Sequence, residues 1–297
     1  MKAALFCILL SFIALSVGSS LNESLTYDEV FYLEEGRGIW NARTFSDPYN
    51  PPLAPFLTGI AGKAGRLVTV GLGTLLIFAV YQAGGTVAAI LLAFHPTLLA
   101  HSHYVTNDVA VTLFIFLGYL AWKRYLVRAT LINAIQTGVA LGFAFATKMT
   151  AIGYMAIVIA ASRWVGKKSR MMSWLTVCII LLVLWATYFF TWDTVIQERD
   201  DPGRVSVRLL AYAKEHDLPI ITSVIFFLKE RPLPLGTYTA TLKNNILRAG
   251  KPSNVFFDGI IYDRSRWYFM IVNFLRKTPV PLLILIGLGL WHQKNKQ

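Results

Sequence analysis

The sequence contains little cysteine and little charge. Its two cysteines, Cys7 and Cys178, both lie inside apolar runs, so neither a disulfide framework nor a CxxC metal or redox site is indicated. Only 15% of the 297 residues are charged, whereas 55% are hydrophobic and the mean hydropathy is +0.53. Ordinary soluble domains carry about 25% charged residues. The composition therefore excludes a soluble secreted module and indicates a membrane protein.

Most of the charges that are present are positive, which gives a formal net charge of +12. A surface that binds nucleic acid would gather these cations along one face. Here they are scattered, or they stand in short groups beside apolar runs, which is the pattern that membrane topology produces. We therefore expect contact with membrane lipids and no binding of nucleic acid.

Long apolar stretches recur along the chain. A membrane-spanning helix needs about 20 mostly apolar residues, with a range of roughly 17–25, and several stretches meet this length or come close to it. We predict an all-α polytopic membrane protein with about eight transmembrane helices. They are placed at residues 3–20, 67–82, 84–100, 108–122, 131–147, 149–164, 173–190 and 278–291.

The predicted helices divide the chain into three parts. Residues 1–190 form a transmembrane core with an outer first loop at 21–66, residues 191–277 form a long outer loop, and residues 278–297 form the last transmembrane helix and a cytoplasmic tail. Within the long loop, "VSVRLLAYAKEH" (205–216) has the spacing of an amphipathic helix, so we expect interfacial helices there.

The orientation follows from Lys and Arg residues in short loops, which are retained on the cytoplasmic side. With the N-terminus inside, three basic groups also fall inside: 123–128, 163–170 and the tail 292–297. The loop from His101 to Asn107 has no Lys or Arg and falls outside. The first loop then lies outside as well, at the extracytoplasmic face of a cell membrane.

The first apolar segment also has features of a signal peptide, because Lys2 precedes the apolar core and the small residues "SVGSS" follow it. However, the apolar run from Ala3 to Val17 is long for a signal core, and no clear A-x-A site follows it. We expect an uncleaved first helix, with cleavage as the alternative.

An acidic pair, Asp28 and Glu29, stands in the apolar stretch "LTYDEVFY" shortly after this segment. Adjacent residues point in different directions on a helix or strand, so we expect one carboxylate to face a cleft and the other to brace a neighbour. A carboxylate at the membrane edge is suited to act as a general base. The alternative is an exposed acidic start of a loop.

The same outer loop contains "YNPPLAPFLTG" (49–59), in which three prolines restrict the backbone and remove amide donors. We expect a rigid, non-helical shelf there, or a plain connector. Arg66 follows at the outer edge of the next predicted helix. Its guanidinium could bind a phosphate or reach the lipid headgroups.

A second polar group, "FHPTLLAHSHYVTND" (94–108), joins the third and fourth predicted helices. His101 and His103 could bind a metal ion with Asp108 as a third ligand, but their spacing does not match a usual zinc motif, and we predict no metal. Asp108 is either a helix cap or a polar residue that faces a water-filled cavity.

Lys148 is a lone cation between "GVALGFAFAT" and "MTAIGYMAIVIAA". It either anchors the two apolar segments at the interface or faces the same cavity as Asp28, Arg66 and Asp108, where it could bind a phosphate. The preceding G-x-x-x-G at 138–142 supplies a small-residue face for close helix packing.

Taken in order, these motifs resemble those of a known family. They are similar to the motifs of polyprenyl-phosphate-sugar-dependent transferases of the protein O-mannosyltransferase type. That type belongs to the C-type membrane glycosyltransferases, which include the aminoarabinose transferase that modifies lipid A. The resemblance covers nearly the whole chain and rests on "YDE" (27–29), "NPPLAP" (50–55), an Arg that opens the second helix, "HPTLLAHSHYVTND" (95–108), "GVALGFAFATK" (138–148) and "WYFMIVNFLRKTPVPLL" (267–283).

The resemblance implies a glycosyltransferase whose catalytic core is residues 1–190. It would take a sugar from a polyprenyl-phosphate donor similar to dolichyl-phosphate-mannose and pass it, with inversion, to a hydroxyl of a protein, lipid or glycan acceptor of the cell envelope. It needs no cofactor. Members are usually longer, so this chain is expected to be a compact or truncated member, or one completed by a partner subunit.

The resemblance also assigns roles to residues of this sequence. Asp28 becomes the catalytic base, with Glu29 beside it in the catalytic pair. Residues that bind the donor phosphate or the substrate are Arg66, His101, His103, Asp108 and Lys148.

The alternative to a transferase is a non-catalytic membrane scaffold or a transporter, in which the acids would relay protons. The sequence has no visible inverted repeat and no paired broken helices around a midplane site. Its polar residues gather at the predicted outer helix ends, which favours a donor at the membrane surface over a pathway through the membrane.

Overall fold

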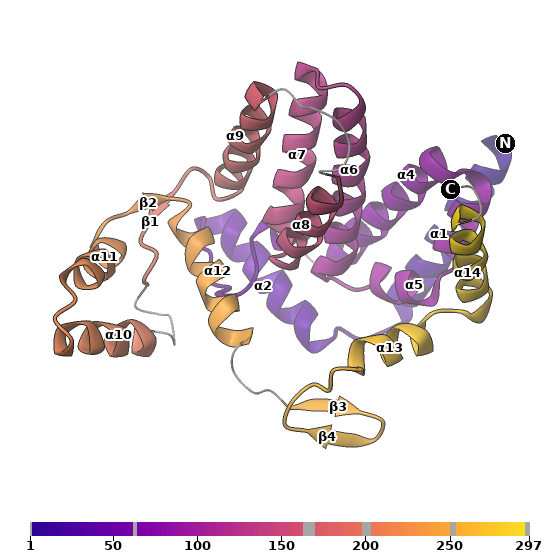
Figure 1. The fold of residues 1–297 in the computed structure, drawn as a ribbon. Helices are drawn as coiled ribbons and strands as arrows, with labels where there is room; N and C mark the ends of the chain where they lie inside the picture. Colours follow the sequence, from indigo (N-terminus) through magenta and orange to yellow (C-terminus); the bar gives the residue numbers. More distant parts are fainter. Residues whose placement is uncertain (1, 62–63, 163–169, 198–202, 250–253, 295–297) are drawn as a thin grey trace.

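The computed structural model describes the chain except for residues 1, 62–63, 163–169, 198–202, 250–253 and 295–297, and it is mainly helical (Figure 1). Its helices are α1 (Lys2–Asn22), α2 (Tyr27–Ala42), α3 (Leu53–Gly59), α4 (Gly65–Ala93), α5 (Pro96–Ser102), α6 (Asn107–Val127), α7 (Leu131–Thr147), α8 (Thr150–Ser162), α9 (Arg170–Thr187), α10 (Gly203–Glu215), α11 (Pro219–Glu230), α12 (Gly236–Ala249), α13 (Phe269–Lys277) and α14 (Val280–Lys294). Two antiparallel pairs of short strands complete the described part, β1 (Trp192–Asp193) with β2 (Leu233–Pro234) and β3 (Val255–Phe257) with β4 (Ile260–Tyr262).

Three helices, α1, α4 and α6, are long and apolar enough to cross a membrane, and a fourth span is added if the bent pair α13 and α14 counts as one. Each of the eight predicted spans overlaps a helix over most of its described residues. However, α7 has only 17 residues and α8 only 13, so the number of eight spans is not confirmed. The predicted inner basic group at 163–170 lies, apart from its last residue, outside the described residues.

The second and third predicted spans fall on α4, which is interrupted at Gly85. This residue has φ 77° and ψ −169°, a conformation that is open to glycine and strained for other residues. The predicted span 84–100 does not continue as one helix, because α5 starts anew at Pro96. The ring nitrogen of His95 accepts a hydrogen bond from the Thr97 amide, and proline at the first helical position has no amide to leave unpaired.

The first outer loop is more helical than predicted, since it contains α2 and α3. The prediction of a non-helical shelf at 49–59 is wrong for Leu53–Gly59, which forms α3. Pro52 stands at the N-cap and Pro55 in the first turn, where the missing amide donors cost nothing. The prolines of this segment therefore start a helix rather than prevent one.

Helices α2 and α3 touch backbone to backbone. A Cβ atom at Gly36 would lie 2.4 Å from the Pro55 carbonyl oxygen, so only glycine fits at this crossing. Next to it, the Trp40 and Phe56 rings stack at 4.6 Å, and the Trp40 indole donates to the Phe56 carbonyl at 2.7 Å. The two helices form one rigid corner that holds the first loop against the core.

Small residues also set the packing of α6, α7 and α9, which lie side by side (Figure 1). Gly138 and Gly142 face Ile179 and Val183 of α9, and a Cβ at either glycine would lie 2.7 Å from these side chains. The predicted small-residue face of this segment is thus confirmed.

The long segment after α9 returns to the first loop through α12. The predicted amphipathic stretch 205–216 lies on α10, which is helical as expected. On α12, Asn244 and Asn245 donate to the carbonyls of Pro48 and Tyr49 at 3.2 and 2.6 Å. Residues almost 200 positions apart are therefore joined, and α12 covers the turn that follows α2.

Candidate functional site

The acidic pair that opens α2 points in two directions, as its adjacency predicts. Thr26 caps the helix, and the Glu29 carboxylate returns to accept a hydrogen bond from the Thr26 amide at 2.9 Å. This places Glu29 inside the protein with no exposed surface, while Asp28 is exposed. The buried acid braces its neighbours, and the exposed acid is accessible to a substrate.

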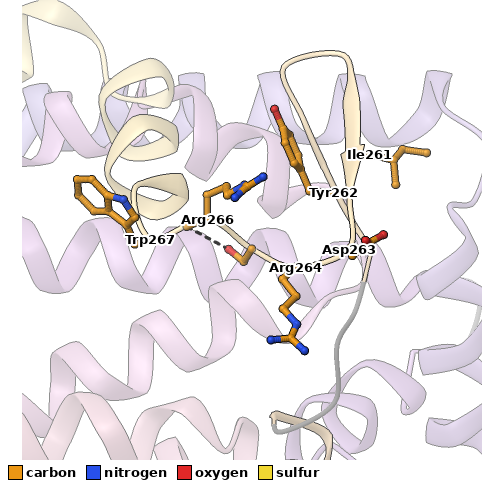
Figure 2. Close-up of a pocket in the computed structure, with 7 residues that line it drawn as sticks. Ile261, Tyr262, Asp263, Arg264, Arg266 and Trp267 are labelled. Carbon is orange, nitrogen blue, oxygen red and sulfur yellow. Dashed lines mark hydrogen bonds between the residues drawn. The ribbon is translucent and has the colours of Figure 1, made fainter.

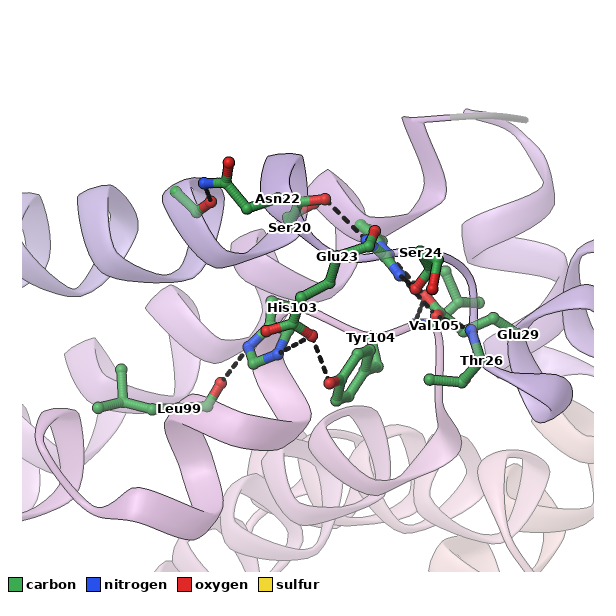
Figure 3. A network of polar contacts seen from close by, with 12 residues as sticks. Ser20, Asn22, Glu23, Ser24, Thr26, Glu29, Leu99, His103, Tyr104 and Val105 are labelled. Carbon is green, nitrogen blue, oxygen red and sulfur yellow. Dashed lines mark hydrogen bonds and ion pairs between the residues drawn. The ribbon is translucent and has the colours of Figure 1, made fainter.

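Glu29 is bound by Arg66 at the start of α4. Figure 3 shows Glu29 close to Thr26 and Val105 in this network. Both side chains are buried, and the guanidinium donates to both carboxylate oxygens at 2.8 Å. The remaining N–H groups of Arg66 donate to main-chain carbonyls at 2.7–2.8 Å. We call this set the Arg66 network: Arg66, Glu29, the carbonyls of Ser20, Glu23 and Ser24, and the amides of Thr26 and Val105 that donate to Glu29.

All five N–H groups of Arg66 are thus occupied within the protein. The carboxylate is equally occupied, because the amides of Thr26 and Val105 supply two further hydrogen bonds. The structure therefore corrects two sequence-based roles. Arg66 has no donor left for a phosphate, and Glu29 has no free oxygen for catalysis.

The Arg66 network changes the acidity of Glu29. Burial disfavours the charged carboxylate, but hydrogen bonds from Arg66 and from the amides of Thr26 and Val105 outweigh it and lower the pKa to about 2. Glu29 therefore stays ionised at neutral pH, and a carboxylate with so low a pKa is a weak proton acceptor.

We expect this lowered pKa to make the fold sensitive to acid. The pKa is below that of an unfolded Glu, about 4.3, so the stabilisation is present at higher pH and is lost as the pH falls from about 5 toward 2. Thermal unfolding of the detergent-solubilised protein between about pH 3 and 7 should show this loss. The Glu29→Gln variant should lose less stability over the same range. An equal acid slope in both proteins would contradict the assignment.

His103 and Tyr104 extend the network toward the end of α5. His103 lies 2.7 Å from the Leu99 carbonyl through one ring nitrogen and 3.2 Å from the Glu23 carboxylate through the other. The Tyr104 hydroxyl also donates to Glu23, and this bond, together with His103, lowers the pKa of Glu23. The sequence placed His103 in the substrate site, but the structure assigns it to this bracing network.

A second cluster lies where α6 begins. The Lys148 ammonium is 2.6 Å from one oxygen of Asp108, and a ring nitrogen of His101 is 3.4 Å from the other. All three side chains are partly exposed, at 32%, 42% and 43%. We call these three residues the Lys148 cluster. The structure brings these three predicted site residues together, and Arg66 is not among them.

Two members of the Lys148 cluster, Asp108 and Lys148, line the polar end of an apolar groove between α6 and α8, with a volume of about 560 Å³. His101 lines a neighbouring pocket, which shares Asp108 with this groove. One face of α6 supplies Asp108, Val111, Thr112, Ile115, Phe116 and Tyr119, and the opposite side supplies Lys148, Thr150 and Tyr154. The α6 positions extend over three helical turns, about 16 Å. The groove is thus shaped for an extended apolar chain that ends in an anion.

Tyr32 links the exposed Asp28 to this cluster. The side-chain amide of Asn107 donates to the Tyr32 hydroxyl at 3.4 Å. Burial, followed by the negative charges of Asp47, Asp28 and Asp108, raises the pKa of Tyr32 to about 12. Three acids that come from α2, the α2–α3 turn and α6 therefore act electrostatically on the same phenol and keep it neutral.

Sequence reasoning missed Tyr32, Asp47 and Asn107. For Tyr32 a signal was present, because it lies four residues after Asp28 and so shares its face of a helix. Asp47 caps a turn by accepting from the amides of Tyr49 and Asn50 at 2.8 and 3.1 Å. No local pattern connects that turn to Tyr32.

The metal alternative finds no support in the described part of the chain, where no three His, Cys, Asp or Glu side chains stand close enough to hold an ion. His101 approaches Asp108, but His103 faces Glu23 instead.

Together, the fold and the site define a helical chain of membrane type whose polar residues gather at the ends of apolar helices. No protein-family model matches the sequence, and the comparison with curated proteins also gives no match. Among solved structures, the chain is similar to the S. cerevisiae protein O-mannosyltransferase Pmt1–Pmt2 complex bound to the sugar donor, with 19% identity and a TM-score of 0.48. The similarity covers 64% of this chain and 32% of that one, and it is a likeness of fold alone.

Proposed function

We propose that the protein transfers a sugar from a polyprenyl-phosphate donor to an acceptor hydroxyl. The observation that carries this proposal is the pair of Lys148 and Asp108 at the polar end of the α6 groove. An isoprenoid chain is apolar and extended, and its phosphate needs a cation at one end. The motif resemblance points to the same donor class.

In this proposal Lys148, with His101 beside it, holds the donor phosphate. Asp108 keeps the ammonium oriented in the absence of donor, at 2.6 Å. Arg66 acts indirectly, because its network fixes Val105 three residues before Asp108. The site faces the extracytoplasmic side in this proposal, since Lys123, Arg124 and Arg128 stand at the other end of α6.

The reaction is a single displacement. Asp28 takes the proton of the acceptor hydroxyl while the oxygen of that hydroxyl forms a bond to the anomeric carbon. The bond from that carbon to the phosphate oxygen breaks on the opposite face, and the polyprenyl phosphate leaves with the electron pair. Attack opposite the leaving group inverts the anomeric centre. The Tyr32 hydroxyl, held neutral, can donate a hydrogen bond to a sugar or acceptor hydroxyl near the reacting atoms.

The test is to supply the purified protein with polyprenyl-phosphate sugars of several kinds, together with protein, lipid and glycan acceptors. Release of polyprenyl phosphate with any donor would support the transferase proposal. Binding without release for every pair, in a protein shown to be folded, would support the alternative of a membrane scaffold. Proteins co-purified from the native membrane would be included in a parallel assay, because a partner subunit could complete the site.

We expect the Lys148→Gln variant to weaken donor binding. A hydrogen bond to a charged group contributes about 1.5–3 kcal/mol, so the donor KM should rise about 10- to 100-fold while kcat changes less. Lys123→Gln, an exposed change at the opposite end of α6, is the matched control and should leave KM unchanged. Equal KM values for the two variants would remove Lys148 from the phosphate site.

A further inference from the structure

Helix α13 packs one of its faces on the β3–β4 hairpin. The Phe269 ring lies 5.4 Å from that of Phe257, and the Tyr268 ring lies 6.0 Å from it. On the same side, the Arg276 guanidinium donates to both oxygens of Asp258 at 3.0 and 3.3 Å and lies 5.5 Å from the Phe257 ring. Hairpin and helix therefore form one folded unit.

The opposite face of α13 is apolar and exposed. Trp267 is 85% and Met270 72% exposed, and three further apolar side chains beside them are more than half exposed. We call this set the α13 apolar face: Trp267, Met270, Ile271, Phe274 and Leu275. Met270, Ile271, Phe274 and Leu275 have the spacing of one helix face, and Trp267 lies two residues before the first residue of α13. No described residue of α13 is buried, so this face has no cover within the described chain.

The direction of α14 indicates what covers the α13 apolar face. The apolar residues 280–289 of α14 form a bent pair with α13, at an angle of 108°. If α14 enters the bilayer along its normal, α13 lies close to the membrane plane. Because the hairpin occupies one side of α13, its apolar face is then free to turn toward the lipid.

The charges beside this face match a negatively charged lipid surface. Between residues 258 and 277 there are four basic and two acidic side chains, and Arg276 is already paired with Asp258. Figure 2 shows the stretch 261–267, which lines a hollow of about 580 Å³. Arg266 points toward the Tyr262 ring, 5.0 Å away, whereas Arg264 points away from it. Lys277 stands at the other end of α13, at the bend into α14.

We propose that the β3–β4 hairpin and α13 form a membrane-surface element whose apolar face inserts into the headgroup region and whose basic residues bind anionic phospholipids. An amphipathic helix of this kind buries its apolar side about 5–10 Å into the bilayer. Each Lys or Arg near an anionic surface contributes about 1 kcal/mol, equivalent to about five-fold in local lipid enrichment. The element would fix the height of the preceding long segment above the membrane.

The experiment uses the full chain, with Cys7 and Cys178, both free and exposed, replaced by serine. Met270→Cys carries an environment-sensitive fluorophore, and Phe274→Cys provides a second labelled variant on the same face. The protein is placed in vesicles of phosphatidylcholine with about a third phosphatidylglycerol. Quenching is measured with iodide in the water and with nitroxide lipids labelled near the headgroup or deep in the chain.

If the α13 apolar face lies in the headgroup region, we expect strong quenching by the shallow nitroxide and little by iodide at both labelled positions. Quenching mainly by iodide, or by neither agent, would overturn the proposal, because the face would then lie in water or against protein. Stronger quenching by the deep nitroxide would also overturn it, because α13 would then be part of a broken span.

The lipid preference is tested with shallow nitroxides on phosphatidylglycerol and phosphatidylcholine. The anionic probe should quench several-fold more strongly, and the triple variant Arg264→Gln, Arg266→Gln and Lys277→Gln should bring the ratio near one. A matched triple variant, K214Q on α10, K229Q on α11 and R231Q just after α11, should leave the ratio unchanged. A ratio near one in the unmodified chain, or an equal fall in both triple variants, would refute the anionic-lipid site.

Discussion

Replacing Asp28 by Asn is expected to lower turnover by about 10²- to 10⁴-fold, with donor binding almost unchanged. The substitution keeps the size of the side chain and most of its hydrogen-bonding capacity, but it removes the basicity that the proposed reaction requires of Asp28. Asp28 is the exposed member of the acidic pair, and its charge acts on Tyr32 together with that of Asp108. The measurement is release of polyprenyl phosphate under single-turnover conditions, with donor affinity determined separately.

The control for Asp28 lies on the same helix. Glu34 is also exposed, six residues further along α2 and therefore on another face. Glu34→Gln should retain turnover. If Asp28→Asn retained it as well, in a folded and active protein, Asp28 would be a structural acid at the start of α2. The base would then have to be sought at Asp108, since Glu29 is enclosed by the Arg66 network.

Breaking the Arg66 network is expected to have the largest effect on stability. Arg66→Leu leaves the buried Glu29 carboxylate without its partner, and loss of one member of a buried ion pair typically costs about 3–5 kcal/mol. We expect a clear fall in the thermal midpoint of the detergent-solubilised protein, together with less folded material on size-exclusion chromatography. Arg37→Gln, an exposed change on α2, is the control and should change neither.

A double variant separates a structural role of Arg66 from a role in phosphate binding. Glu29→Gln combined with Arg66→Leu removes both charges, so it should be less destabilised than the sum of the single variants. If Arg66 served the donor phosphate instead, Arg66→Leu would keep the thermal midpoint and raise the donor KM. That result would restore the role predicted from the sequence.

The sequence predicted side-chain directions and helix contacts correctly where these depend on a single helix. The divergent directions of Asp28 and Glu29 follow from their adjacency on a helix, and the close approach of α7 to α9 follows from two glycines one turn apart. Of the two alternatives for Lys148, the structure agrees with the one that places it near Asp108, since both residues stand at ends of apolar helices. In each case the relevant geometry is local or is imposed by the membrane.

The sequence was misleading where segments far apart in the chain bind the same side chain. Arg66 looks like a free cation at a helix edge until residues 20–29 and Val105 are brought against it. The prolines at 51–55 look like a helix-breaking run, but their positions relative to the helix start decide the outcome. Tyr32 accepts a hydrogen bond from Asn107, and the charge of Asp47 raises its pKa. Both effects depend on how α2, α3 and α6 pack together, which the local sequence does not indicate.

The residues of the Arg66 network are synthesised at different times. Its parts leave the ribosome separately: the carbonyls of residues 20–24 and the Glu29 carboxylate come first, Arg66 follows 37 residues after Glu29, and the Val105 amide follows 76 residues after it. The guanidinium can therefore meet its carboxylate early, while the last hydrogen bond waits for the segment that begins α6. A nascent chain halted between residues 66 and 105 would carry Arg66 and Glu29 without the Val105 amide, and the Lys148 cluster can form only later, because Lys148 follows Val105 in the chain.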